Sequence, residues 1–226
     1  MQMLARKIRG NGVKVVLTGD GSDEAFGGYL YFHKAPGPRE LHEECLRKLA
    51  MMHMYDCLRV NKTLLSWGVE PRVPFLDREF LDVAMRLDPR EKLCGNGRME
   101  KHILRTTFSD YLPESIAWRQ KEQSSDGVGY GWMDGLKALA ASAVFHPMLA
   151  AGGHAFPHNT PTTKEAYFYR NIFEELFPHR SAAHCAPGGK TAGNATEAAS
   201  RWLGDALVDD PSGRAVLGIH ASSLQR

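Results

Sequence analysis

The sequence predicts an α/β fold, mostly helical and built around the end of a parallel sheet. Three observations favour it. The run from Val13 to Leu17 is short, apolar and rich in β-branched residues, which is typical of a strand in a buried parallel sheet. A glycine-rich turn follows at once, and beyond it apolar residues recur at helical spacing along most of the chain. The composition, 43% hydrophobic and 24% charged over 226 residues, is ordinary for a globular protein.

The net charge and the cysteines indicate which binding partners and which cellular compartment to expect. The net charge of +2 and the absence of a long Lys/Arg run predict no nucleic-acid surface. The apolar stretch near the N-terminus is too short for a signal segment or a membrane span, so we expect no membrane association. The cysteines are widely separated, which indicates neither a zinc site nor a disulfide framework and favours reduced thiols in the cytoplasm.

The first elements are expected to be a short helix and the strand. The helix carries Leu4 and Ile8 on one face and ends at Gly10-Asn11-Gly12. The strand is stopped by the turn that includes Gly19 and Gly21, and a helix begins directly after it. Ser22 is expected to be the N-cap of that helix.

Three carboxylates crowd this turn at the carboxyl end of the strand, where open α/β sheets bind ligands. Asp20, Asp23 and Glu24 would repel a bare pyrophosphate, so the pattern indicates a phosphate site that includes magnesium. An EF-hand is excluded, because Ala25 and Tyr31 stand where that loop needs Gly and Glu. A capped, solvated turn without a ligand remains an alternative.

A core-facing amphipathic helix is expected from about residue 39 to residue 59. Its apolar stripe consists of Leu41, Cys45, Leu49 and Met52. Asp56 and Arg59 lie three residues apart near its end, where by default they form a surface ion pair of little energetic value.

The proline-rich segment 69–77 is predicted to be a rigid connector rather than a helix. Asp77 can cap a helix over 78–87, and a further amphipathic helix follows. The apolar residues that mark this further helix are Met99, Ile103, Leu104 and Phe108. Single basic residues such as Arg72 and Lys101 could reach a ligand but are more often solvated.

The segment 118–132 is a second stretch with chemical content. Its alternating Gly127, Gly129 and Gly131 argue against a helix interior and for a mobile loop or one pressed against a ligand. Alone it could be a flexible surface loop. Beside the acidic turn, Lys121 and a loop that excludes water would suit a transferred phosphate, whose charge needs cationic partners.

The remaining chain is predicted to contain two helices and a tail. The helices cover 132–144 and 164–177, the second with a capping box that starts at Thr162. His146 and His158 are interpreted as loop residues rather than ligands. From residue 181 onward Ala, Gly and Ser dominate, and the tail is expected to be poorly ordered apart from a short helix around Trp202.

Several strings in this order resemble the synthetase domain of glutamine-dependent (class B type) asparagine synthetases. They are GDGSDEAFGGYLYFHKAP, MYDCLR, WGVEPRVPFLD, NGRMEKHILR and WRQKEQSSDGVGY. The resemblance runs from about Val13 to Phe177. It implies that residues 1–180 are the C-terminal part of an adenine-nucleotide alpha-hydrolase-like (PP-loop ATPase) domain, followed by the tail over 181–226.

The resemblance also implies an activity and its partners. Aspartate would attack ATP to give an aspartyl-adenylate and pyrophosphate, with Mg²⁺ neutralising the leaving group, and ammonia would then displace AMP. Aspartate, ATP and ammonia are thus the expected partners, and a homodimer is possible.

Roles for individual residues follow from the same resemblance. Asp23 would hold the magnesium and, with Glu24, would lie at the pyrophosphate, and Asp20 would act as the general base for ammonia. Lys121 would be the catalytic lysine at the phosphates and the acyl-adenylate. The remaining implied contacts are Thr18 and Gly19 to AMP, Asp56 and Arg59 near the phosphate and substrate pocket, and Ser124 to Gly127 around aspartate.

The sequence departs from the family's pattern in two positions. Glu is usual where this chain has Asp20, and an aromatic residue is usual where it has Ser124. The shorter side chain retracts the carboxylate by roughly 1 Å, and a misplacement of that size can cost about a hundredfold in rate.

Two upstream features of the family are absent: the glutaminase domain with its N-terminal cysteine, and the Ser-Gly-Gly-x-Asp-Ser loop. We therefore expect a C-terminal fragment or truncated product that cannot hydrolyse glutamine and adenylates poorly. A β-lactam-forming relative and a non-catalytic nucleotide-binding or interaction module remain alternatives.

Overall fold

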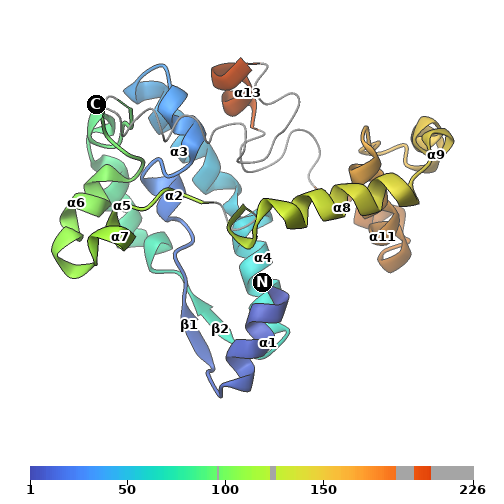
Figure 1. The fold of residues 1–226 in the computed structure, drawn as a ribbon, viewed down its shortest axis with the longest axis horizontal. Helices are drawn as coiled ribbons and strands as arrows, with labels where there is room; N and C mark the ends of the chain where they lie inside the picture. The colour runs from blue at the N-terminus through green and yellow to red at the C-terminus, as the bar shows by residue number, and fades with distance from the viewer. Residues whose placement is uncertain (96, 123–125, 187–195, 205–226) are drawn as a thin grey trace. The chain divides into compact units, whose positions relative to one another are not determined.

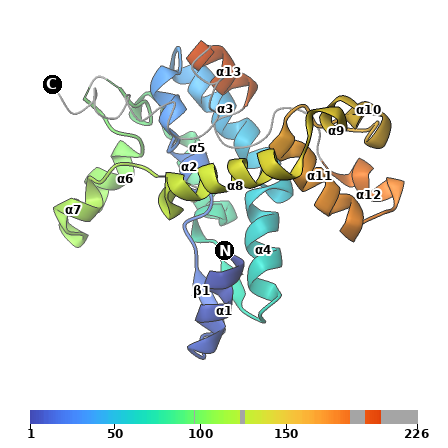
Figure 2. The same cartoon turned by 45° about the vertical axis from the view of Figure 1, so that its right-hand side comes forward.

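The computed structural model describes residues 1–95, 97–122, 126–186 and 196–204, and it divides into two compact units. Unit 1 comprises Met1–Lys121 and Ala192–Arg226, and unit 2 comprises Glu122–Thr191. Figures 1 and 2 show the helices and strands of both units from two directions. The boundary that the sequence predicts at residue 180 stays a prediction.

Unit 1 surrounds a small parallel sheet with helices. Its strands are β1 (Val15–Leu17) and β2 (Glu70–Arg72). Its α-helices are α1 (Gln2–Gly10), α2 (Ser22–Ala25), α3 (Pro38–Met51), α4 (Asp56–Leu65), α5 (Arg78–Arg86), α6 (His102–Thr107), α7 (Glu114–Ala117) and α13 (Glu197–Leu203). Its short 3₁₀ helices are η1 (Leu30–Lys34), η2 (Met52–Met54), η3 (Pro74–Leu76), η4 (Pro89–Glu91) and η5 (Ser109–Tyr111). The predicted fold class, α/β with mostly helical structure around the end of a parallel sheet, is confirmed.

The sheet pairs β1 with β2 in parallel, with Val16 opposite Pro71. Proline is tolerated there because the hydrogen bonds run from the Glu70 N–H and from the Thr18 N–H to the other strand, and none is required of Pro71. Sequence reasoning took this proline-rich segment for a plain connector and missed β2. The burial predicted for β1 is also wrong: Val15 and Leu17 are 48% and 76% exposed, because the described residues form only two strands.

Helix α1 lies beside this sheet and packs on α4, and β2 follows α4 after a short turn (Figure 1). Their contact is a buried cluster of Ala5, Val60, Leu64 and Val69. The predicted helix with its end at Gly10 is confirmed, but Leu4 is 60% exposed and Ala5 takes its place. The small Ala5 side chain lets the α1 backbone approach α4 closely.

The helix predicted from residue 39 to residue 59 is wrong as a single element. Helix α3 ends at Met51, η2 follows, and Tyr55 breaks the helical path with φ −127° and ψ −89° before α4 begins. The apolar spacing is the same on both sides of this break, so periodicity could not reveal it. As a consequence, Asp56 starts a new helix, where a carboxylate is favoured by the helix dipole.

Of the two N-caps predicted in unit 1, one is confirmed and one is wrong. Asp77 caps α5 as predicted, accepting a hydrogen bond from the Phe80 N–H at 3.0 Å. Ser22 is not the N-cap of α2, because Gly21 takes that position in the left-handed conformation. The amphipathic helix expected from Met99 onward is shorter than predicted and begins only at His102.

The regular structure that is described in unit 2, over residues 126–186, is helical. Its helices are η6 (Asp126–Val128), α8 (Tyr130–Ala143), α9 (His146–Ala150), α10 (Gly152–Ala155), α11 (Lys164–Leu176) and α12 (Arg180–Cys185). Helices α8 and α11 pack on one another around Val144, Phe156 and Tyr167. Thr163, not Thr162, caps α11, and His146 begins a helix instead of lying in a loop, because Pro147 is acceptable in a first helical turn.

The tail predicted after residue 181 is partly helical. Helix α12 covers its first residues, and the helix expected around Trp202 is found as α13. The rest of the predicted tail, 187–195 and 205–226, lies outside the described residues. None of the helices that the structure describes has the length and apolar character needed to cross a bilayer.

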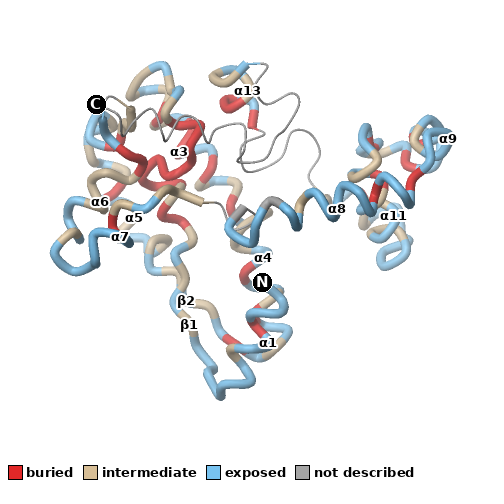
Figure 3. The backbone as a smooth tube through the Cα atoms, in the orientation of Figure 1, coloured by how far each residue is buried: buried red, intermediate tan, exposed pale blue. Residues whose placement is uncertain are grey.

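The core of unit 1 lies around α2 and α3, where Figure 3 shows the buried residues gathered. Its centre is a cluster of Tyr29, Tyr31, Phe32, Leu41, Cys45 and Ala199. The segment that follows β1 therefore runs from the exposed sheet directly into the best-packed part of the unit.

Candidate functional site

The turn after β1 depends on a glycine. Gly21 has φ 97°, and a Cβ there would lie 2.5 Å from Leu76 Cδ2. Only glycine combines that conformation with so close a neighbour. The turn starts α2 immediately after the strand and brings Asp20, Asp23 and Glu24 to the carboxyl end of β1, as the sequence predicts.

Asp23 is held by two lysines. Its Oδ1 lies 2.8 Å from Lys101 Nζ and its Oδ2 lies 3.2 Å from Lys121 Nζ. Burial raises the pKa of Asp23, but the charges of Lys101 and Lys121 outweigh it and hold the pKa below its ordinary value. One carboxylate and two ammonium groups give this cluster a net charge of +1, which suits an anionic ligand.

The two lysines come from distant parts of the chain. Lys101 lies just before α6 in the left-handed conformation, with φ 55°, which is uncommon for a residue other than glycine. Strain of this kind is concentrated at functional sites. Lys121 follows α7. The resemblance implies that it contacts the phosphates and the acyl-adenylate, and the structure brings it to Asp23 in a direct ion pair.

Gly28 makes room for the Asp23 carboxylate. A Cβ at this position would lie 2.1 Å from Asp23 Oδ1 and 2.7 Å from Asp23 Cα. The Gly28 N–H also donates to the Asp23 carbonyl at 2.7 Å. The double glycine after α2 is therefore a requirement of the site as well as of the turn.

Glu24 lies deeper than Asp23 and is 3% exposed. Tyr29 donates its hydroxyl hydrogen bond to Glu24 Oε1, and Lys48 Nζ lies 4.3 Å from the centre of the Tyr29 ring. Burial raises the pKa of Glu24 and lowers the pKa of Lys48. The apolar stripe predicted for the helix of Lys48 does not include this residue, and its burial beside Glu24 and Tyr29 is revealed only by the tertiary packing.

Thr18 and Gly19 line the approach to the turn. The Thr18 hydroxyl is buried and has no hydrogen-bond partner among the described residues, so it remains available to a ligand. A Cβ on Gly19 would meet nothing within 4 Å, so open space surrounds its backbone. The Gln120 amide nitrogen is likewise buried without a described partner, and sequence reasoning did not single it out.

Asp56 and Arg59 form the expected ion pair, with Arg59 donating to Asp56 Oδ1 at 2.5 Å. Burial is the main cause of the raised pKa of Glu24, and the Asp56 charge adds to it, so the pair lies within electrostatic reach of the acidic turn. Asp20 and Asp56 likewise contribute, after burial, to the raised pKa of Cys57. Ser124 lies outside the described residues, and the predicted aspartate contacts stay a prediction.

The described residues contain no group of three or more His, Cys, Asp or Glu side chains that could hold a metal ion. Asp23 fits magnesium as a single ligand only, since Lys101 and Lys121 share its carboxylate. A divalent cation here would need most of its ligands from a bound phosphate.

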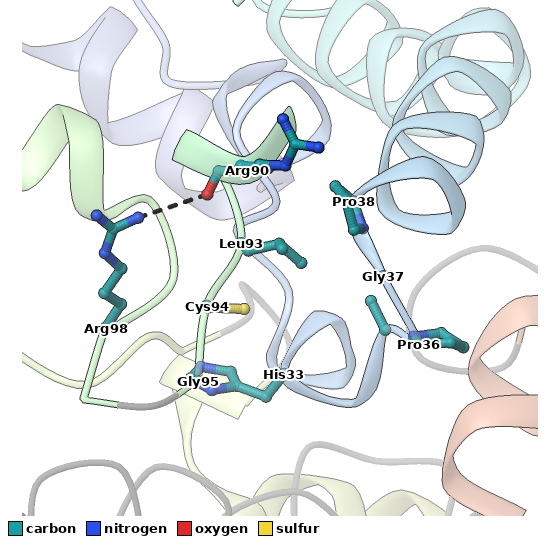
Figure 4. Close-up of a pocket in the computed structure, with 10 residues that line it drawn as sticks. His33, Pro36, Gly37, Pro38, Arg90, Leu93, Cys94, Gly95 and Arg98 are labelled. Atoms are coloured by element: carbon teal, nitrogen blue, oxygen red, sulfur yellow. Dashed lines mark hydrogen bonds between the residues drawn. The ribbon is translucent and has the colours of Figure 1, made fainter. Parts of the chain in front are cut away.

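A separate open pocket of about 530 Å³ lies between η1 and the chain after η4. Figure 4 shows His33, Arg90, Cys94 and Arg98 around it. None of the predicted site residues lines it. The His33 ring is also engaged with a buried carboxylate, since its Nε2 lies 3.0 Å from Glu100 Oε2.

A family model matches most of the chain. The model described as "Asparagine synthase" matches residues 1–39 and 35–203. The chain belongs to the asparagine synthase family. The resemblance that the sequence motifs carry is thereby confirmed.

Individual asparagine synthetases are similar along the whole chain. Asparagine synthetase B [glutamine-hydrolyzing] of Escherichia coli (strain K12) is 60% identical over 227 residues, which cover 100% of this chain and 41% of that protein. The root enzyme of Pisum sativum is 54% identical over 234 residues, covering 100% and 40%. Asparagine synthetase [glutamine-hydrolyzing] 1 of Arabidopsis thaliana is 53% identical over 232 residues, covering 99% and 39%. The chain thus spans about 40% of the length of these relatives.

Proposed function

We propose that this chain carries the synthetase chemistry of its family, the ATP-dependent conversion of aspartate to asparagine. An oxygen of the aspartate side chain attacks the α-phosphorus of ATP, the bond to the β-phosphate breaks, and pyrophosphate leaves. Ammonia then attacks the acyl carbon of the aspartyl-adenylate, AMP leaves, and the surplus proton passes to a base. The ammonia would come from glutamine, as the names of the relatives suggest.

The observation that carries this proposal is the pair of lysines on Asp23. Pyrophosphate is a polyanionic leaving group, and preorganised cations stabilise the charge that develops on it. Lys101 and Lys121 lie 2.8 and 3.2 Å from the Asp23 carboxylate oxygens, at the carboxyl end of β1. Asp23 keeps both ammonium groups in place before the substrate binds, so little reorganisation is needed.

Magnesium enters the proposal together with ATP. It would neutralise the phosphates, and Asp23 would supply one carboxylate ligand while the phosphate oxygens supply others. Thr18 and Gly19 would contact the AMP part through the buried hydroxyl and the open backbone. Glu24, Asp56 and Arg59 would set the charge around the nucleotide.

Asp20 is the residue to which we assign the general base. No hydrogen bond or ion pair engages its carboxylate within the described part of the chain, so it is available to a proton. It is one methylene shorter than the glutamate usual in the family, and the longer Asp20→Glu side chain is expected to raise the rate by up to about a hundredfold. The assay is asparagine formation from ATP, aspartate and ammonia. An unchanged rate would show that the shorter side chain of Asp20 does not limit the reaction.

Exchange of labelled pyrophosphate into ATP tests the reaction class, because it requires reversible adenylation and no ammonia. We expect slow exchange that depends on aspartate and disappears in Lys121→Met. Exchange that requires a different carboxylic acid would favour the β-lactam-forming alternative. An absence of exchange together with unimpaired ATP binding would favour a non-catalytic nucleotide-binding module, and an absence of both would contradict the proposal.

Two further expectations accompany this proposal. The four cysteines are unpaired, which suits a reducing compartment such as the cytoplasm. The homodimer remains a prediction from family resemblance, and sedimentation of the purified chain would test it.

A further inference from the structure

Helix α13 packs on the buried aromatic residues next to the candidate site, which are Tyr29, Tyr31 and Phe32. The Trp202 ring centre lies 5.8 Å from that of Tyr31 and 6.2 Å from that of Phe32. Ala199 is completely buried in the same cluster, and Tyr31 and Phe32 are 0% exposed. A segment distant in sequence therefore covers the core face of η1.

Thr196 has two hydrogen bonds at the start of this helix. Its hydroxyl oxygen accepts from the Ala199 N–H at 3.0 Å, which caps α13, and its O–H donates to Glu44 Oε1 at 3.1 Å. Thr196 is 2% exposed and Glu44 is 4% exposed. One side chain thus both starts α13 and attaches it to α3.

Glu44 is the point where three elements meet. Besides Thr196 on the α13 side, it accepts from the Tyr31 hydroxyl at 2.7 Å and from Arg47 Nε at 2.6 Å. Burial raises the pKa of Glu44, but the donors from Arg47 and Tyr31 outweigh it and hold the pKa below its ordinary value. A buried carboxylate is costly unless its oxygens are satisfied, so the loss of one donor disturbs the others.

Charges on the two helices are complementary along the same edge. A groove of about 410 Å³ has Glu40 and Glu43 of α3 on one side and Arg201 of α13 on the other. Glu197 at the start of α13 also contributes to the raised pKa of Arg47, after the nearer Glu44. These charges favour one orientation of α13 on α3.

The rings of Tyr31 and Tyr29 connect α13 to the candidate site. Tyr31 stacks on Tyr29 with ring centres 5.9 Å apart, and Tyr29 donates to Glu24. Lys48 Nζ lies 4.3 Å from the Tyr29 ring centre and 5.7 Å from that of Tyr31. A shift of Tyr31 would therefore move the wall that holds Glu24 and Lys48.

We propose that docking of α13 through Thr196 and Trp202 positions the Tyr29–Lys48 wall of the candidate nucleotide site, so that this C-terminal segment is required for tight ATP binding. Thr196 and Trp202 are positioning residues in this account, since they act through Tyr31 and Glu44. The part of the proposal that concerns ATP rests on the proposed function; the docking and its effect on the wall do not.

The test compares three variants of the full chain. Thr196→Val removes the hydroxyl at nearly constant volume, and Thr196→Ser retains it. Thr163→Val is the matched control, because Thr163 caps α11 in the same way, accepting from the Ala166 N–H at 3.1 Å, without any bond to Glu44. The first readout is hydrogen–deuterium exchange of the peptide over 28–34. The second is the rate of chemical modification of Lys48, and the third is ATP affinity by calorimetry.

We expect Thr196→Val to accelerate exchange over 28–34 and modification of Lys48 by about tenfold, the ratio that corresponds to losing a hydrogen bond to a charged group. ATP affinity should fall in parallel, while Thr196→Ser and Thr163→Val behave as the unchanged chain. Unaltered exchange and modification in Thr196→Val would overturn the proposal, and so would altered exchange with unaltered ATP affinity. If the unchanged chain binds no ATP, the proposed function fails, and the first two readouts still decide whether α13 positions the wall.

Discussion

At the scale of single residues, the Asp23 carboxylate lies so close to the Gly28 backbone that a side chain at position 28 would occupy the same space. Gly28→Ala is therefore expected to displace Asp23 from Lys101 and Lys121. As overpacking does, it should lower the free energy of unfolding by roughly 1–3 kcal/mol, which a lower urea midpoint would show. Gly135→Ala is the matched control, since nothing lies within 4 Å of a Cβ in the middle of α8, and should stabilise by about 0.5–1 kcal/mol. Equal effects of the two substitutions would contradict this account of Gly28.

The ion pairs of Asp23 predict a dependence of stability on pH. The folded-state pKa of Asp23 is lowered from its ordinary value of 3.8, so the pairs stabilise the fold above that pH. Their contribution is lost as the pH falls through the lowered pKa, because the protonated carboxyl no longer attracts the lysines. Asp23→Asn should therefore cost roughly 1–3 kcal/mol at pH 7 and progressively less below pH 3.8.

Urea titrations of the unchanged chain and the variant at several pH values measure that difference. Asp82→Asn is the control, since its pair with Arg86 is exposed and contributes about 0–1 kcal/mol. A difference between Asp23→Asn and the unchanged chain that persists unaltered well below pH 3.8 would be inconsistent with the assignment of the lowered pKa to Asp23.

At the scale of elements, the cap of α5 is a feature that sequence and structure share. Asp77→Ala should lower stability by about 1 kcal/mol, because the Phe80 N–H loses its acceptor, while Asp77→Asn keeps an equivalent cap. Hydrogen exchange in α5 checks the prediction. Identical exchange in both variants would show that the side-chain cap is unimportant.

Local signals were sufficient for such elements and insufficient for their assembly. The turn at Gly19 to Gly21, the cap at Asp77 and the helices α1, α8 and α11 each leave a pattern within a few residues. The break at Tyr55 and the strand β2 do not, because the first preserves the apolar spacing and the second depends on pairing with β1. Periodicity reports which residues share a face, not which other element covers that face.

The candidate site shows the same division. Asp23 was identifiable because acidic residues followed a strand and a glycine turn, and Lys121 because of the family motif. Lys101 could be noted only as one basic residue among many, since nothing local indicates that its left-handed backbone directs Nζ to Asp23. Nothing in the local sequence indicates that Lys48 is buried, although it is 6% exposed and lies against the Tyr29 ring.

At the scale of the whole molecule, the described site belongs to unit 1, and among the described residues the sheet next to it has two strands. Val15 and Leu17 of β1 remain exposed, and the chain spans about 40% of the length of its asparagine synthetase relatives. The family match establishes that the chain belongs to the asparagine synthase family. Because the chain spans only part of its relatives, adenylation of aspartate has to be measured on the chain itself.

The central claim is that Asp23, Lys101 and Lys121 form a binding site for the phosphates of ATP. Calorimetric titration of Mg·ATP into the unchanged chain and into Lys121→Met tests it most directly, with Lys7→Met on the exposed face of α1 as the control. The account predicts binding by the unchanged chain and by Lys7→Met, and affinity weaker by about tenfold or more in Lys121→Met, as expected for a lost charge-assisted contact. Equal affinity in all three proteins, or no binding by the unchanged chain, would contradict it.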